Sequence, residues 1–134
     1  MSQEVFDFLS VNRPFYMATV DGETPKVRPM GFVMFYEGKI WFGMGTYKNV
    51  YKQLQANPQV EISATGPNNE DWIRISGRAV FDQRPQLFKA ALEAMPRLKD
   101  IYPEGGAKMA IFSLVPGQAS FMSIGGTPTK IIDW

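Results

Sequence analysis

The sequence predicts a mainly β protein, an antiparallel β-barrel with helices at its periphery. Most of its segments alternate apolar and polar residues with the period of two that is typical of half-buried strands. Successive segments are joined by tight-turn signals such as Asp21-Gly22 and Glu37-Gly38, which favour hairpins. Helical segments are few, whereas every parallel pair of strands needs a long crossover, so a parallel α/β sheet is not expected.

The length and composition indicate one globular domain, which we expect to span residues 1–134. Hydrophobic residues make up 45% of the chain and charged residues 20%, which excludes wholesale disorder. Fourteen Lys and Arg residues are balanced by thirteen Asp and Glu residues, and this net charge of +1 argues against a nucleic-acid or anionic-membrane partner. The amino terminus is not a signal peptide, and no apolar run approaches the about 20 residues of a membrane span. We therefore expect a cytoplasmic protein.

The first half of the chain is expected to contain two helices and three strands. Apolar side chains recur at helical spacing over residues 3–11, and Asn12-Arg13-Pro14 ends this helix. A second helix over residues 47–56 stops at Asn57-Pro58. Strands rich in aromatic and β-branched residues are expected between the two helices, over residues 15–20, 26–36 and 39–44.

The second half of the chain continues with strands and one longer helix. Asp82 can cap a helix that runs to about residue 95. We assign the apolar stripe of this helix to the core; it consists of Leu87, Phe88, Ala91, Leu92 and Met95. Strands are expected before and after the helix, over residues 60–65, 72–81, 108–115, 118–124 and 130–134.

The chain contains no cysteine and no histidine, which excludes several kinds of chemistry. Disulfides, thiolate zinc sites, Fe–S clusters and cysteine nucleophiles are impossible without cysteine. A Ser-His-Asp triad, a His-ligated metal and an imidazole proton relay are impossible without histidine. We therefore expect no metal site, and any reaction must depend on other side chains, on backbone groups or on a bound cofactor.

The start of the second helix has the wrong charge for a helix N-terminus. Free N–H groups there carry partial positive charge and favour acidic side chains, but the sequence places Lys48 in the first turn and Lys52 four residues later. A bound anion would resolve this conflict, with Thr46 and Asn49 adding polar groups and two glycines allowing close approach. These residues predict a phosphate site. The alternative is a surface helix with two solvated lysines.

The second strand also departs from ordinary strand chemistry. Proline cannot donate to a β-ladder and glycine weakens a strand, yet this strand contains Arg28-Pro29-Met30-Gly31. The segment must therefore lie at an edge, at a bulge or where a ligand docks. A guanidinium followed by a thioether suits a flat heterocycle with polar edges. The alternative is an edge strand with a solvated arginine.

Several motifs follow one another in the middle of the chain, within residues 26–81. They are Val-Arg-Pro-Met-Gly, Gly-Lys-Ile-Trp-Phe-Gly, Thr-Tyr-Lys-Asn-Val-Tyr-Lys-Gln-Leu, Ala-Asn-Pro-Gln-Val-Glu-Ile and Trp-Ile-Arg-Ile-Ser-Gly-Arg-Ala. In this order they resemble the pyridoxamine 5'-phosphate oxidase-like family of FMN-binding split barrels. The resemblance implies a six-stranded antiparallel Greek-key split barrel, and a homodimer with FMN bound in two clefts at the subunit interface.

The resemblance also implies which residues bind the cofactor. The strand segment that would border the isoalloxazine ring and its pyrimidine edge is Arg28, Pro29 and Met30. The turn and helix start that would hold the ribityl chain and the phosphate are Met44, Gly45, Thr46, Lys48 and Asn49. Large side chains outside these two segments are candidates to reach the site from the second subunit, namely Trp72, Phe121 and Trp134.

The sequence departs from the oxidases of this family in ways that bear on function. Their Arg-rich phosphate motif is replaced by Lys48-Asn49, and their substrate-binding histidine has no counterpart. Oxidation of vitamin B6 and haem degradation with a histidine ligand are therefore not expected. The resemblance implies an FMN-dependent oxidoreductase of unassigned substrate. The alternatives are a flavin-binding electron carrier or sensor, a barrel that holds deazaflavin or haem, and an interaction module without a cofactor.

Overall fold

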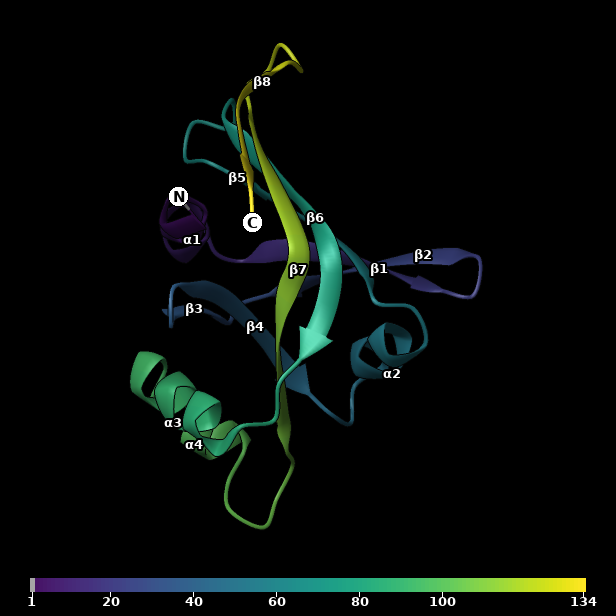
Figure 1. Ribbon diagram of the computed structural model, residues 1–134, viewed down its shortest axis with the longest axis vertical. Coiled ribbons are helices and arrows are strands. Elements are labelled where there is room, and N and C mark those ends of the chain that lie inside the picture. Colours follow the sequence, from purple (N-terminus) through teal and green to yellow (C-terminus); the bar gives the residue numbers. More distant parts are fainter. Residues whose placement is uncertain (1) are drawn as a thin grey trace.

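The strands form one curled antiparallel sheet, which the computed structural model describes over residues 2–134 (Figure 1). The strand order is β2-β1-β5-β6-β7-β4-β3, and β8 pairs with β7 beside this path. The strands are β1 (Phe15–Asp21), β2 (Thr24–Met30), β3 (Val33–Tyr36), β4 (Lys39–Gly45), β5 (Gln59–Thr65), β6 (Trp72–Phe81), β7 (Met109–Met122) and β8 (Pro128–Asp133). The predicted mainly β split barrel is confirmed, although eight strands rather than six form in the described residues.

The helices lie outside the sheet. They are α1 (Ser2–Val11), α2 (Asn49–Ala56), α3 (Pro85–Ala94) and the short α4 (Leu98–Ile101), which the sequence pattern did not predict. In Figure 1, α1 lies beside β3 and β4, α2 lies beside β1 and β4, and α3 and α4 lie together at the opposite end from β8. No helix within residues 2–134 is both long and apolar enough to cross a membrane.

Two strand predictions needed correction. The predicted strand 26–36 is two strands, because β2 ends at Met30 and β3 begins at Val33. The part that contains proline is an edge strand, because β2 pairs only with β1 among the described residues. Its other edge has no neighbouring strand that would need a backbone donor, so prolines are tolerated there. The predicted strands 108–115 and 118–124 are instead one strand, β7, because Gly117 continues the ladder by exchanging two backbone hydrogen bonds with Trp134.

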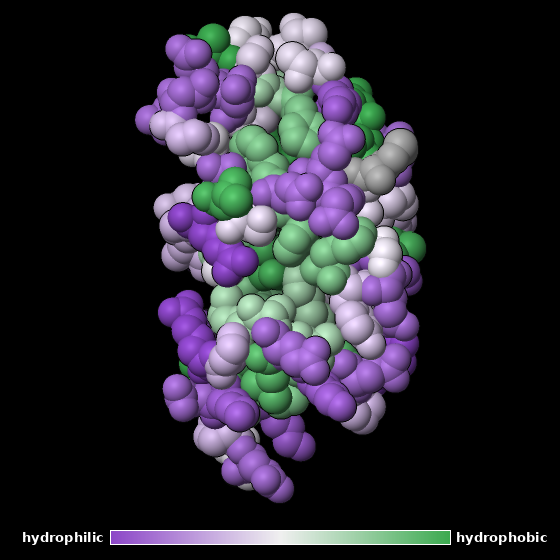
Figure 2. Space-filling view, turned by 90° about the vertical axis from the view of Figure 1, so that its left-hand side faces the viewer, coloured by the Kyte–Doolittle hydropathy of each residue, from purple (hydrophilic) through white to green (hydrophobic). Residues whose placement is uncertain are grey.

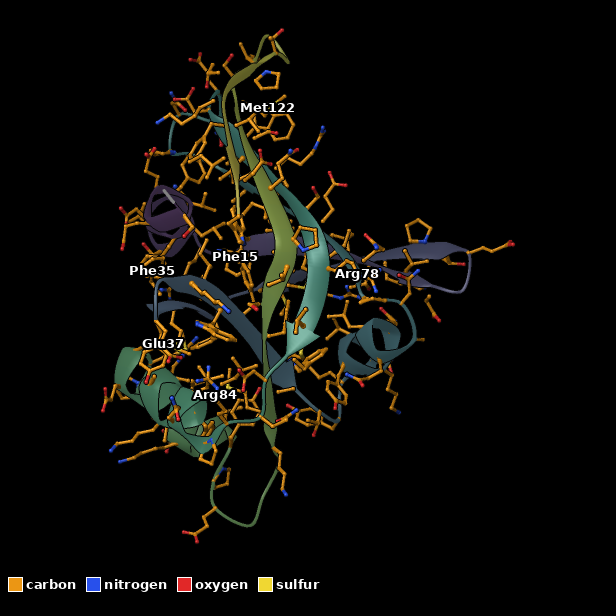
Figure 3. All side chains as sticks on the ribbon, in the orientation of Figure 1. Phe15, Phe35, Glu37, Arg78, Arg84 and Met122 are labelled. Atoms are coloured by element: carbon orange, nitrogen blue, oxygen red, sulfur yellow. The ribbon has the colours of Figure 1, made fainter. Side chains whose placement is uncertain are left out.

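The main core fills the inside of the curled sheet. Phe15, labelled in Figure 3, is fully buried there and packs edge-on against Phe42, which in turn stacks on Phe112. The α1 helix contributes Val5 and Leu9 to the same cluster. These contacts hold β1, β4 and β7 together, and β4 leads directly into α2.

A second, smaller cluster lies under α3 and shows that the apolar stripe of this helix has two environments. Leu87 and Ala91 are fully buried against Trp41 and its neighbours. Phe88, Leu92 and Met95 are only half-buried at the margin of this cluster. The assignment of the stripe to the core is therefore confirmed for Leu87 and Ala91, while the other three residues pack against the same cluster and also line the clefts described below.

The surface around these helices is unevenly apolar. Figure 2 views the side that carries α1, β3 and α3, and shows apolar residues running down the middle of this face between hydrophilic margins. Other large apolar side chains are exposed on the sheet, including Tyr16, Val27, Val80 and Val115. Contiguous apolar surface of this kind is typical of places that a ligand or a partner covers.

Candidate functional site

A cleft of about 1390 Å³ opens between β2, β4, α2 and α4. Its end near α2 is polar and includes Asn49 and Gln53, whereas its end near α4 is apolar and includes Leu98 and Ile101. Between these ends the wall is formed by side chains suited to a flat apolar ligand, namely Met30, Phe32 and Met44. The cleft can therefore hold a molecule that is charged at one end and apolar at the other.

The charged lining of this cleft is strongly positive. Five cationic side chains line it, and Asp21 is the single carboxylate among its lining residues. The cations are Lys26, Arg28, Lys48, Lys52 and Arg97. Within residues 2–134 none of these five makes an ion pair, although the same part of the chain contains four ion pairs elsewhere. An anionic ligand would supply the missing negative charge.

Arg28 is held in place by neutral partners. Its Nη1 donates to Thr19 Oγ1 at 2.7 Å and to the Met17 carbonyl at 3.2 Å, and its Nη2 donates to Gln53 Oε1 at 2.7 Å. The Thr19 hydroxyl also donates to Gln53 Oε1, at 2.6 Å. Partial burial lowers the pKa of Arg28 from its usual value, but the guanidinium remains charged. This network turns Arg28 toward α2.

The α2 helix begins without the groups that usually satisfy a helix N-terminus. Lys48 is the N-cap residue, no side chain caps the helix, and the first turn contains no acidic residue. The helix therefore begins with a positive residue and with free N–H groups in its first turn, and both favour an anion. The charge conflict predicted at this helix start is present in the structure.

The glycines before α2 also have a packing role. A side chain at Gly45 would meet the ring of Tyr47, and one at Gly43 would meet the Met109 side chain of β7, so either change would force its neighbour to shift. The predicted close approach of a ligand at these glycines stays a prediction. Thr46 is also engaged internally, since its backbone N–H donates to the Lys108 carbonyl at 2.9 Å.

The structure brings most of the predicted cofactor residues to one place. The cleft is lined by Arg28, Pro29, Met30, Met44, Lys48 and Asn49. Gly45, Thr46 and Trp134 are not among its lining residues. The roles of all nine in binding a cofactor stay predictions.

Sequence reasoning missed several residues of the cleft. Gln53 follows Asn49 by one helical turn, so the helical spacing of α2 could have revealed it. Tyr102 and Met109 reach the cleft from α4 and β7, and no local pattern marks them. Burial and the nearby Tyr47 raise the pKa of Tyr102, so its hydroxyl keeps its proton at neutral pH.

Trp134 is tied into its own subunit. Its indole Nε1 donates to the Leu114 carbonyl at 3.0 Å, its ring lies against Gly117, and its backbone pairs with Gly117 in both directions. The chain end is therefore part of the sheet and not frayed.

We expect deletion of Trp134 to lower the free energy of unfolding by about 2 kcal/mol, because the chain loses a half-buried aromatic ring and three hydrogen bonds. Urea denaturation of the shortened and full-length chains measures this difference. An unchanged midpoint would show that these contacts contribute nothing to stability.

Comparison with known proteins places these features in a family. The family model described as pyridoxamine 5'-phosphate oxidase matches residues 1–123. No curated protein sequence matches the chain. Among solved structures, a NimC/NimA family protein from Clostridium acetobutylicum is 33% identical with a TM-score of 0.88, and the match covers 98% of this chain and 92% of that one.

Two more distant structures share the fold. A pyridoxamine 5'-phosphate oxidase-related, FMN-binding protein from Nostoc punctiforme is 22% identical with a TM-score of 0.63, over 95% of this chain and 83% of that one. An FAD-binding protein from Mesorhizobium loti is 13% identical with a TM-score of 0.60, over 89% of this chain and 93% of that one. At these identities the likeness concerns the fold alone.

Proposed function

The chain belongs to the pyridoxamine 5'-phosphate oxidase family, and we propose that it binds FMN in the cleft beside α2 and acts as an FMN-dependent oxidoreductase of unassigned substrate. One observation carries this proposal. The cleft combines five lining cations, none of them in an ion pair within residues 2–134, with an apolar wall of Met30, Phe32 and Met44.

The lining residues fit the two chemical parts of FMN. The phosphate matches the α2 end, where Lys48 and Lys52 meet the uncapped helix start and Arg28 is held toward the same helix. The isoalloxazine ring matches the apolar stretch of the cleft. One such helix start suits one phosphate, which is the charged part of FMN.

When bound, the flavin supplies hydride or electron transfer, and the chain supplies position and electrostatics. Lys48 and Arg28 would anchor the charged end, so that the ring lies at a fixed depth. The apolar residues around Met30 and Met44 would keep water from the ring. A proton for the substrate could be held at Tyr47 or Lys52. Tyr102 also lines the cleft, but burial raises its pKa further above neutrality and makes its hydroxyl a weaker acid.

The space around the cleft favours an enzyme over an electron carrier. A carrier needs only a flavin edge that opens on a docking surface, whereas an enzyme needs room for a substrate beside the ring. A second cleft of about 600 Å³ adjoins the first one, and Tyr102 and Met109 line both. This adjoining space supports the oxidoreductase.

We expect the protein to select FMN over FAD. The chain has no Gly-x-Gly-x-x-Gly segment, which a dinucleotide would usually require, and it has one uncapped lysine-bearing helix start as a phosphate site. Reconstitution with equal amounts of FMN and FAD, followed by removal of free ligand and mass measurement, should show retained FMN. One structure of the same fold is named FAD-binding, so FAD is the competing ligand. Retention of FAD alone would overturn the choice of FMN.

We also expect a homodimer whose interface completes the cofactor site. The cleft of about 1390 Å³ exceeds the usual volume of about 300–1,000 Å³ for a ligand pocket, as expected where a second subunit closes it. Exposed apolar side chains such as Tyr16 and Val27 provide surface for that subunit. Trp72 and Phe121 remain our candidates to reach the partner's cofactor, and Trp134 could do so only from its place against Gly117 of its own sheet.

Sedimentation velocity with and without FMN tests the shared site. A ligand that binds only the dimer stabilises the assembled state by mass action, so FMN should shift the protein toward the dimer. A monomer that holds FMN as tightly as the parent protein would refute a site shared between subunits.

A further inference from the structure

The second cleft has its own walls and lies apart from the α2 end of the cofactor cleft. Six of its sixteen lining residues come from α3 and the segment before it, and the other ten are Lys99, residues 102–109 and Ile111. On α3, Phe88 and Leu92 are one helical turn apart, half-buried, and part of this wall. Leu87 and Ala91 occupy the fully buried side of the same helix. Phe88 and Leu92 pack against the smaller core cluster with part of their surface and line the second cleft with the rest.

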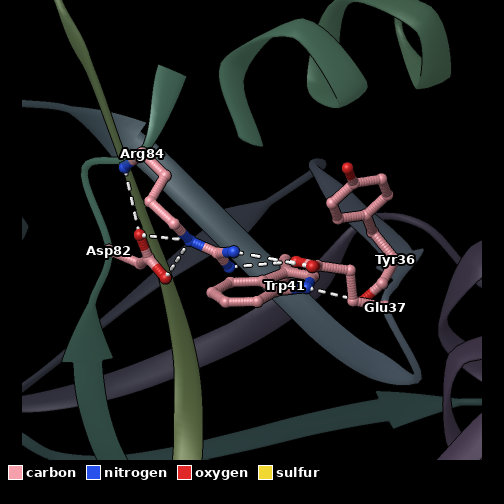
Figure 4. A network of polar contacts seen from close by, with 5 residues as sticks. All are labelled: Tyr36, Glu37, Trp41, Asp82 and Arg84. Carbon is pink, nitrogen blue, oxygen red and sulfur yellow. Dashed lines mark hydrogen bonds and ion pairs between the residues drawn. The ribbon is translucent and has the colours of Figure 1, made fainter. Parts of the chain in front are cut away.

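The charges of the second cleft cancel. Arg84 Nε donates to both carboxylate oxygens of Asp82, at 3.1 and 3.0 Å, and its Nη2 donates to Glu37 Oε1 at 2.9 Å (Figure 4). Figure 3 shows Arg84 and Glu37 close together beside β3 and α3. The other charged lining residues are Lys99, Lys108 and Glu104. With Glu37 included, three cations are balanced by three carboxylates.

This balance contrasts with the cofactor cleft, where five cations are opposed by one carboxylate. The two clefts therefore favour different ligands. An anion gains Coulomb energy in the first cleft, while the second cleft offers it little attraction. An uncharged molecule gives up no charge hydration when it enters the second cleft, and its apolar contact with Phe88 and Leu92 favours binding. Its volume of about 600 Å³ falls within the usual range for small-molecule sites.

The two clefts meet at Tyr102 and Met109, which line both. Met109 also lies against Gly43 of β4, inside the cofactor cleft. Because burial keeps Tyr102 protonated, the junction carries no charge at neutral pH. A molecule in the second cleft would therefore lie beside the apolar end of the cofactor cleft.

From this arrangement we propose that the second cleft is a binding site for an uncharged, largely apolar small molecule, which is the class of substrate that would meet the flavin. The choice of substrate class rests on the proposed function, whereas the existence of the site rests on the charge balance and the apolar wall alone.

The test uses 2-naphthol as an uncharged probe and 2-naphthoate as its anionic counterpart. Equilibrium dialysis against the full chain without flavin should show that 2-naphthol binds, with 2-naphthoate weaker by at least about tenfold. Ala107→Trp, in the exposed loop, and Leu92→Trp, on α3, fill the cleft from opposite walls. Each variant should weaken 2-naphthol binding by at least about tenfold.

Ala94→Trp is the matched control, since Ala94 is exposed at the end of α3 and lines neither cleft. It should leave 2-naphthol binding unchanged. FMN binding, followed by flavin fluorescence, should stay unchanged in Ala107→Trp and in the control. In the protein loaded with FMN, 2-naphthol should perturb the flavin absorption spectrum, and Ala107→Trp should remove that perturbation.

The proposal is overturned if both filled variants bind 2-naphthol like the parent, or if 2-naphthoate binds as tightly as 2-naphthol. It is also overturned if bound 2-naphthol leaves the spectrum of a loaded flavin unchanged. A failure of the proposed function can be distinguished from a failure of this proposal. In that case the protein would bind no flavin, while 2-naphthol would still bind to the second cleft.

Discussion

Lys48→Ala is expected to weaken FMN binding by about 1.5–3 kcal/mol, the usual scale of a charge-assisted hydrogen bond. Lys48 is the N-cap residue of α2 and makes no ion pair within residues 2–134, so its charge is available to a ligand. Riboflavin lacks the phosphate, and its binding should be nearly unchanged. Fluorescence titration of both ligands with the parent and the variant measures the difference.

The matched control for this experiment is Lys89→Ala. Lys89 is an exposed lysine of α3 that lines neither cleft, so its loss should leave the affinities for FMN and riboflavin as they are. Equal weakening of both ligands by Lys48→Ala would place the phosphate elsewhere. Equal loss of FMN affinity in the two lysine variants would show only a general charge effect.

Arg28→Met is expected to weaken FMN binding by a comparable amount, about 1.5–3 kcal/mol, because the variant keeps much of the apolar stem and loses the positive charge. The fold should tolerate the change: Thr19 and Gln53 remain hydrogen-bonded to each other after the guanidinium is removed. Thermal unfolding of the variant checks this expectation, and fluorescence titration gives the affinity.

Binding of riboflavin to Arg28→Met shows whether Arg28 contacts the ring or the phosphate of FMN. The family resemblance places Arg28 at the pyrimidine edge of the ring, which predicts equal losses for FMN and riboflavin. The bond from Arg28 to Gln53 of α2 favours the phosphate end instead, so we expect FMN binding to weaken more than riboflavin binding. Arg78→Met is the control, because Arg78 is exposed on β6 and lines neither cleft. Unchanged FMN affinity in Arg28→Met would remove Arg28 from the site.

Much of the fold could be predicted from local patterns, because strands and helices depend partly on the residue types found within a few positions of one another. Alternation of apolar residues identified β1, β5 and β6 nearly to their ends, and Asn57-Pro58 marked the end of α2. The predictions failed where a distant partner decides the outcome. The β7 strand continues past Pro116 because Trp134 pairs with Gly117, and no local pattern contains that contact.

The candidate site was likewise predictable only where its features are local in the sequence. Lysines without acidic neighbours at a helix start conflict with the helix dipole, and this conflict can be seen in a few adjacent residues. The sequence alone therefore identified the helix start around Lys48 as a candidate anion site, and that role stays a prediction. It contains no signal for the packing of Gly43 and Gly45 against Met109 and Tyr47.

By itself, then, the sequence determined that the barrel is mainly β, that the chain offers neither thiol nor imidazole, and that α2 begins with a lysine and without an acidic residue. Only the tertiary structure decided that Arg28 turns toward Gln53, and that Phe88 and Leu92 face a second cleft. The physical reason is the range of the interactions. Helix capping and strand alternation involve residues within a few positions of one another. The orientation of the Arg28 guanidinium and the balance of charge in a cleft depend on segments that folding brings together.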